Sequence, residues 1–133
     1  MKSQRTNRFK GTASEHLACA DMWLQGHKAY MVPGDVFDVI LKTKNQLYKI
    51  QVKSSSFSMY THKALTFSLN RGCKAKKLYQ IGEIDGYAFI DLVYKKVCYM
   101  SIYELNNKWK VTIQRKRFKD LTLDRLINER KKG

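Results

Sequence analysis

The sequence contains no apolar run that approaches the roughly 18–20 residues needed to span a membrane. The basic segment at residues 1–9 is not followed by the apolar stretch that a secretory signal requires. There are three cysteines, an odd number without paired spacing, which is typical of a reducing cytoplasm rather than of a disulfide scaffold. These scarcities predict a cytoplasmic protein with no membrane partner.

Acidic residues are also scarce. Lys and Arg outnumber Asp and Glu by 26 to 11, which gives a net charge of +15, and this excess makes a polyanion the expected partner. A content of 44% hydrophobic residues is enough for a core and excludes wholesale disorder. The length of 133 residues predicts one domain, residues 10–133, preceded by a basic arm, residues 1–9.

The positive charge lies in two blocks. No acidic residue occurs between Val39 and Gly82, and a second basic block runs from Lys108 to the end, whereas 83–104 is the acidic exception. Each block is interleaved with aromatics, namely Tyr48, Phe57, Tyr60, Phe67, Tyr79, Trp109 and Phe118. Any single charge run is as well explained by a solvated face, but the combination favours nucleic acid. The predicted contact segments are 57–80 and 106–119, with the basic arm as a third; the candidate DNA-contacting residues are Ser55, Lys63, Arg71, Lys74, Lys76, Lys77, Arg115, Lys116 and Arg117.

Hydrophobic periodicity and turn residues predict a helix, a mostly β middle and a terminal helix, and hence an α/β domain with a central mixed sheet flanked by helices. The first helix is expected over residues 12–25, with a capping box formed by Thr12 and Glu15 and a stop at Gly26. The expected strands are 27–32, 36–42, 47–54, 64–69, 86–94, 97–102 and 109–113; residues 71–79 are expected as a loop or short helix, and 121–130 as the last helix.

Strands 36–42 and 47–54 are predicted to form a β-hairpin. A turn centred between Lys44 and Asn45 places Asp38 opposite Gln51, with Lys53 one step away on the same face. The other face is then apolar and carries Phe37, Val39, Leu41, Ile50 and Val52. Because side chains alternate between the two faces of a strand, Asp35 does not lie on the same face as Asp38 unless a β-bulge changes its direction. An ordinary cross-strand ion pair on an exposed face explains the same pattern.

The first helix contributes a second carboxylate. At about 100° per residue, Ser14, Asp21 and Gln25 share one polar arc, and Asp21 is expected to be a solvated surface acid. Glu15 lies on the face that carries Ala18, which should pack against the sheet. The alternative is that Glu15 serves only the capping box.

Two carboxylates, an amide oxygen and a lysine are the groups that a metal-dependent phosphodiesterase needs. Hard oxygen ligands suit Mg²⁺, the metal neutralises the scissile phosphate and activates water, and a lysine stabilises developing charge. In so basic a chain we expect the two carboxyl groups to have lowered pKa values. Glu15, Asp38, Gln51 and Lys53 are therefore the candidate catalytic residues.

The same residues carry a family resemblance. Glu15, the segment GDVFD (34–38) and the segment QVK (51–53) resemble the PD-(D/E)XK nuclease superfamily, most closely its small intron-type homing endonucleases. The longer segments HKAYMVPGDVFDVI (27–40), YKIQVKSSS (48–56), IGEIDGYAFI (81–90) and VCYMSIYEL (97–105) are similar to that group as well. The resemblance covers about residues 11–105 and implies a restriction-endonuclease-like fold.

The resemblance implies a role for each residue. Glu15 and Asp38 would be metal ligands or their supports, Gln51 a metal ligand or water-orienting group, and Lys53 the catalytic lysine. Gln51 replaces the usual acid and brings no charge, so the backbone carbonyl of Val52 would help to hold the Mg²⁺ or Mn²⁺. This departure leaves the number of metals open.

The implied function is metal-dependent, site-specific cleavage of double-stranded DNA by a homodimer or homotetramer, in a bacterium or a phage-infected cell. Two other interpretations stay open. One is a Holliday-junction-type resolvase that uses the same catalytic face, and the other is a non-catalytic DNA-binding protein.

Overall fold

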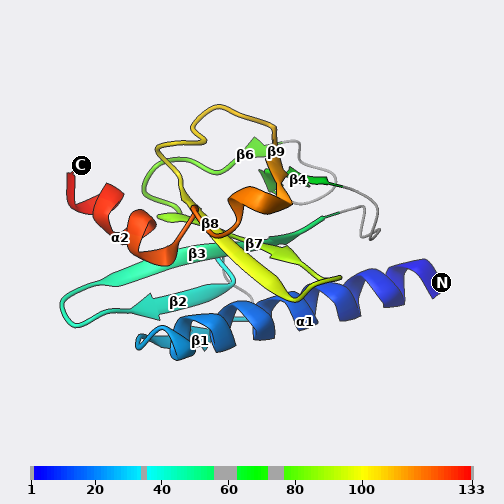
Figure 1. Ribbon diagram of the computed structural model, residues 1–133, viewed down its shortest axis with the longest axis horizontal. Coiled ribbons are helices and arrows are strands. Elements are labelled where there is room, and N and C mark those ends of the chain that lie inside the picture. The colour runs from blue at the N-terminus through cyan, green and yellow to red at the C-terminus, as the bar shows by residue number, and fades with distance from the viewer. Residues whose placement is uncertain (1, 34–35, 56–62, 72–76, 133) are drawn as a thin grey trace.

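The computed structural model describes residues 2–33, 36–55, 63–71 and 77–132, with the side chains of 8–33, 36–55, 63–71 and 77–129. Figure 1 shows the arrangement of the elements. These are helices α1 (Lys2–Leu24) and α2 (Leu123–Lys132), the short 3₁₀ helix η1 (Arg115–Arg117), and strands β1 (Lys28–Met31), β2 (Val39–Lys42), β3 (Leu47–Ser54), β4 (Ala64–Ser68), β5 (Asn70–Arg71), β6 (Lys77–Leu78), β7 (Gly86–Asp91), β8 (Lys96–Ser101) and β9 (Lys110–Gln114).

The central sheet has five strands in the order β1-β2-β3-β7-β8. Strands β3 and β7 are parallel and the other pairs are antiparallel, so the sheet is mixed, as the sequence predicts. Two smaller pairs, β4–β9 and β5–β6, lie outside it. The predicted α/β class with a central mixed sheet is therefore confirmed.

The two faces of the sheet are covered differently. Ala18 and Met22 of α1 and Leu126 of α2 pack into one cluster with Val39 and Ile50 of the sheet, so both helices cover the same face. The opposite face is covered by an aromatic-rich cluster that includes residues of β4, β7, β8 and β9. The two helices thus cover only one face of the sheet, and the β4–β9 pair helps to cover the other face.

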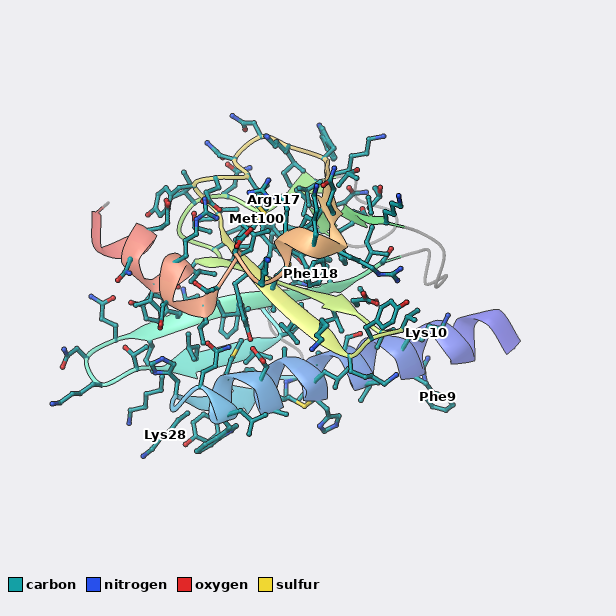
Figure 2. The ribbon with its side chains drawn as sticks, in the orientation of Figure 1. Phe9, Lys10, Lys28, Met100, Arg117 and Phe118 are labelled. Atoms are coloured by element: carbon teal, nitrogen blue, oxygen red, sulfur yellow. The ribbon has the colours of Figure 1, made fainter. Side chains whose placement is uncertain are left out.

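The first helix is longer than predicted. It begins at Lys2, so Thr12 lies inside it and the predicted capping box is wrong. In Figure 1 the N-terminal part of α1 extends beyond the sheet, and Figure 2 shows Phe9 and Lys10 on this part. The predicted stop is confirmed: Gly26 has φ of +90°, and His27 N–H donates to the Met22 carbonyl, as in a Schellman motif. Among the described residues, no helix has the length and apolar content to cross a membrane.

The hairpin register agrees with the prediction. Val39 pairs with Ile50 and Leu41 with Tyr48, which places Asp38 opposite Gln51. The turn is local, since Thr43 N–H donates to the Gln46 carbonyl at 2.9 Å. The strand begins only at Val39, and this is why the prediction for Phe37 is wrong. Outside the strand the alternation of faces does not hold, and Phe37 packs into the cluster opposite the helices.

Two further expectations are corrected. Asp21 is not a solvated acid, because it accepts a hydrogen bond from the buried Tyr99 hydroxyl and another from the Gln25 amide. Residues 71–79 form neither a simple loop nor a helix where they are described, since Arg71 pairs with Lys77 in β5–β6. The first difference depends on a contact between residues 78 positions apart in the chain.

Gly86 shows how closely α2 packs on the sheet. An added Cβ would lie 2.5 Å from Leu126 Cδ1 and 2.8 Å from the Met100 carbonyl oxygen. We expect Gly86→Ala to lower the free energy of unfolding by about 1–3 kcal/mol, because a backbone carbonyl would have to move. Gly11→Ala is the matched control: its Cβ would have no neighbour within 4 Å, so stability should rise by about 0.5–1 kcal/mol. Denaturant unfolding measures both, and wild-type stability for Gly86→Ala would contradict this packing.

Candidate active site

Asp38 directly precedes β2 and lies opposite Gln51 of β3. Its N–H donates to the Ile50 carbonyl at 3.0 Å, and its Oδ2 accepts the Val52 N–H at 3.0 Å. The backbone of β3 thus holds both the main chain and the carboxylate of Asp38. Val52 contributes its N–H here, and the proposed role of its carbonyl as a metal ligand stays a prediction.

Glu15 comes to the same place from α1. Burial, and after it the charge of Asp38, raise the pKa of Glu15 from 4.5 to about 7. Burial also raises the pKa of Asp38, although the Val52 N–H and the Lys53 ammonium both act to lower it. The structure therefore brings the two predicted carboxylates together. The expectation of lowered pKa values is wrong, because burial outweighs the positive charge of the chain.

Gln51 points to the face opposite the helices. The parallel register pairs it with Tyr87, whose ring belongs to the aromatic cluster on that face. Gln51 is 8% exposed, and its Oε1 is a buried acceptor without a hydrogen-bond partner among the described residues. A buried amide oxygen in this state is costly unless something binds it.

Lys53 lies two residues farther along β3 on the same face as Gln51. Its Nζ donates to the Asn70 carbonyl at 2.8 Å and lies 5.7 Å from the centre of the Tyr79 ring. Its charge also reaches Asp38, whose pKa it acts to lower. The structure thus couples Glu15 to Asp38 and Asp38 to Lys53, and it places Gln51 on the same face of β3 as Lys53.

This donor set fits a hard divalent cation. Two carboxylates whose proximity raises a pKa, and an unpartnered buried amide oxygen, are the oxygen ligands that Mg²⁺ or Mn²⁺ prefers. No group of three or more His, Cys, Asp or Glu side chains able to hold a metal occurs in the described parts of the chain. The role of the Gln51 amide oxygen as a third ligand stays a prediction. Asp35 lies outside the described residues.

Eight of the nine predicted DNA-contacting residues divide into three groups. Lys63, Lys77, Lys116 and Arg117 are exposed, and all lie in or beside the layer formed by β4–β9 and β5–β6; Figure 2 labels Arg117. Ser55 donates to the Thr66 carbonyl at 3.3 Å, and Arg71 pairs with Glu83 at 2.7 Å. Lys74 and Lys76 lie outside the described residues.

Arg115 stands apart from this basic surface. Its guanidinium donates to Asp91 at 2.7 and 3.3 Å, and the Asp91 side chain is 3% exposed. The Arg115 N–H also donates to the Lys63 carbonyl, and its guanidinium lies 4.8 Å from the Tyr94 ring. Its charge is thus already balanced inside the protein, and its role is to hold η1 against the end of β7.

Most of the aromatic residues in the basic blocks do not offer stacking surfaces. Tyr48, Phe67, Tyr79 and Phe118 are buried, whereas Trp109 is half exposed; Phe57 and Tyr60 lie outside the described residues. The sequence pattern missed two groups that contact Lys53, the Asn70 carbonyl and the Tyr79 ring. No local signal marks a backbone carbonyl, and the sequence pattern favours Tyr79 as a nucleic-acid contact instead.

The fold has known relatives. It is similar to the bacterial homing endonuclease I-Ssp6803I, with a TM-score of 0.67 and 16% identity over 80% of this chain and 76% of that one. The chain has the restriction-endonuclease-like fold. Hjc, a Holliday junction resolvase from the archaeal hyperthermophile Archaeoglobus fulgidus, is also similar, with a TM-score of 0.57 and 18% identity over 90% and 96% of the two chains. No family model and no curated protein sequence matches.

The raised pKa of Glu15 predicts a pH dependence of stability. The folded protein binds this proton more tightly than the unfolded chain, so Glu15 contributes stability below pH 4.5 that is lost as pH rises to about 7. Without divalent metal, we expect Glu15→Gln to become progressively more stable than wild type across this range and to keep its advantage above it. Melting temperatures measured from pH 4 to 8 test this.

Asp120→Asn, which removes one exposed negative charge from the segment before α2, is the control. A wild-type profile parallel to that of Glu15→Gln would show that Glu15 does not titrate in this range.

Proposed function

We propose that this protein is a divalent-metal-dependent endonuclease that hydrolyses DNA phosphodiester bonds. The observation that carries the proposal is that Asp38 is coupled electrostatically both to the carboxyl group of Glu15 and to the Lys53 ammonium. The buried, unpartnered Gln51 oxygen, two residues before Lys53 on the same strand face, supports it. Similarity to two nucleases supports it at the level of fold, and the net charge of +15 supports a nucleic-acid partner. Because fold alone does not define chemistry, the site residues bear the argument.

Each residue has a definite task in this proposal. Glu15, Asp38 and Gln51 would hold Mg²⁺ or Mn²⁺, which when bound neutralises phosphate charge and lowers the pKa of a coordinated water. Asp38 is held for this by the Val52 N–H. Lys53 stabilises the negative charge that develops on the phosphate as water attacks. The exposed lysines and Arg117 on the β4–β9 side bind the DNA backbone and bring the phosphate to the site.

We further propose cleavage of the homing-endonuclease type, in which both strands of a specific site are cut. One chain carries one such site, so cutting both strands calls for a second copy, in a homodimer or homotetramer. The similarity to Hjc, which extends over 96% of that chain, favours junction resolution as the second candidate.

The catalytic proposal is tested with Lys53→Ala. Loss of the ammonium removes charge stabilisation in the transition state, so Mg²⁺-dependent cleavage should fall by about 100-fold or more while DNA affinity stays within about threefold. Lys49→Ala is the matched control, because Lys49 lies on the same face of β3 but binds the Gly82 carbonyl away from the site. Chelation by EDTA should stop wild-type cleavage. Undiminished cutting by Lys53→Ala would refute the assignment.

The two candidate activities differ in substrate. A homing-type enzyme should cut long linear duplex DNA into discrete fragments, whereas a resolvase should cut only four-way junctions. We expect discrete fragments from phage and bacterial DNA, with Lys53→Ala as the background control on both substrates. Cleavage confined to junctions would establish the resolvase. Salt-sensitive binding with no metal-dependent product on either substrate would mean that the protein only binds DNA.

A further inference from the structure

The small hairpin β5–β6 contacts the side chain of Lys53. The Nζ of Lys53 donates to the Asn70 carbonyl of β5 at 2.8 Å. It also lies 5.7 Å from the centre of the ring of Tyr79, the residue that follows β6. This distance is within the range of a cation–π interaction. The ammonium is therefore held from two points of one element.

The ring of Tyr79 is itself fixed by its surroundings. Tyr79 is 7% exposed and meets Tyr87 edge to face, with ring centres 6.1 Å apart. Tyr87 stacks on Phe89 at 5.5 Å, and these two residues pair with Gln51 and Lys53 in the parallel register. A row of rings along β7 thus lies beside the two polar residues of β3 and ends at Tyr79.

Charged groups surround Tyr79 as well. The Arg71 guanidinium lies 5.7 Å from the same ring and is held by Glu83 at 2.7 Å. Burial first, and then the charge of Asp38, raise the pKa of the Tyr79 hydroxyl to about 12, so the hydroxyl stays protonated and lies within electrostatic reach of Asp38. Tyr79 thus lies beside the cations of Lys53 and Arg71 and close enough to Asp38 to be affected by its charge.

We propose that Tyr79 is a positioning residue, whose ring, together with the Asn70 carbonyl, holds the Lys53 ammonium beside Asp38. The proposal rests on the nuclease function argued above. A lysine side chain has four rotatable bonds and, without restraint, samples many conformations. An ammonium that is seldom in the productive position stabilises the transition state poorly. Contacts from the β5–β6 hairpin and from Tyr79 restrain these rotations. A lysine of the central sheet is thus oriented by an element outside that sheet.

The first test compares cleavage rates. Tyr79→Phe keeps the ring and should cut at close to the wild-type rate. Tyr79→Leu removes the ring and should lower the single-turnover rate by about 10- to 100-fold at saturating Mg²⁺ and DNA, with unchanged DNA affinity. Pentafluorophenylalanine at position 79 keeps the shape of the ring but reverses the charge on its face. The variant should therefore cleave as slowly as Tyr79→Leu, although it leaves no cavity in the core.

The second test reads the position of Lys53 directly and does not depend on activity. A ring next to the ammonium shifts the NMR signals of the Lys53 ε-methylene protons upfield. These signals are assigned to Lys53 because they are absent from the spectrum of Lys53→Arg. The shift should persist in Tyr79→Phe and disappear in Tyr79→Leu. Tyr94→Leu, which removes a ring from Arg115 instead, should alter neither the rate nor these signals.

Two results would overturn the proposal. One is a Lys53 signal that is the same in Tyr79→Leu as in wild type, and the other is a Tyr79→Phe variant as slow as Tyr79→Leu. If the wild-type protein cuts no DNA, the nuclease proposal fails, and the NMR comparison alone decides whether Tyr79 holds the lysine.

Discussion

The register between β2 and β3 is the constraint on which the candidate site depends. It places Asp38 beside the end of β3, where the Val52 N–H binds the carboxylate, and it sends Gln51 and Lys53 to the face opposite α1. A slip of one residue would turn Gln51 and Lys53 toward the helices and bring Ile50 and Val52 into their place. The buried Val39 and Ile50 make such a slip costly.

Burial, rather than the net charge, controls the electrostatics of the site. The chain carries a charge of +15, yet the carboxyl groups of Glu15 and Asp38 have raised pKa values because desolvation outweighs the surrounding cations. Among the described residues, Arg71, Arg115 and Arg125 form ion pairs with other acids, namely Glu83, Asp91 and Glu104. Two desolvated carboxylates that share one place are a combination that favours a divalent cation.

The predictions that succeeded concern neighbours along the chain. The β2–β3 hairpin depends on a four-residue turn and on side-chain alternation, both visible in the sequence, and the end of α1 depends on Gly26. Of those that failed, one concerns a distant partner. Asp21 lies on a polar arc of the helix but binds Tyr99, which is 78 residues away. The N-terminal extension of α1 was missed because its basic residues indicated an arm.

The sequence by itself determined the α/β class, the hairpin register and the identity of the four polar residues, because each follows from local periodicity and turn chemistry. Only the tertiary structure decided that Gln51 is buried without a hydrogen-bond partner among the described residues, that Glu15 and Asp38 share one desolvated place, and that β5–β6 holds Lys53. These properties arise when α1 packs on one face of the sheet and an aromatic layer on the other. Burial and contact between distant segments depend on the whole fold, and no window of sequence contains them.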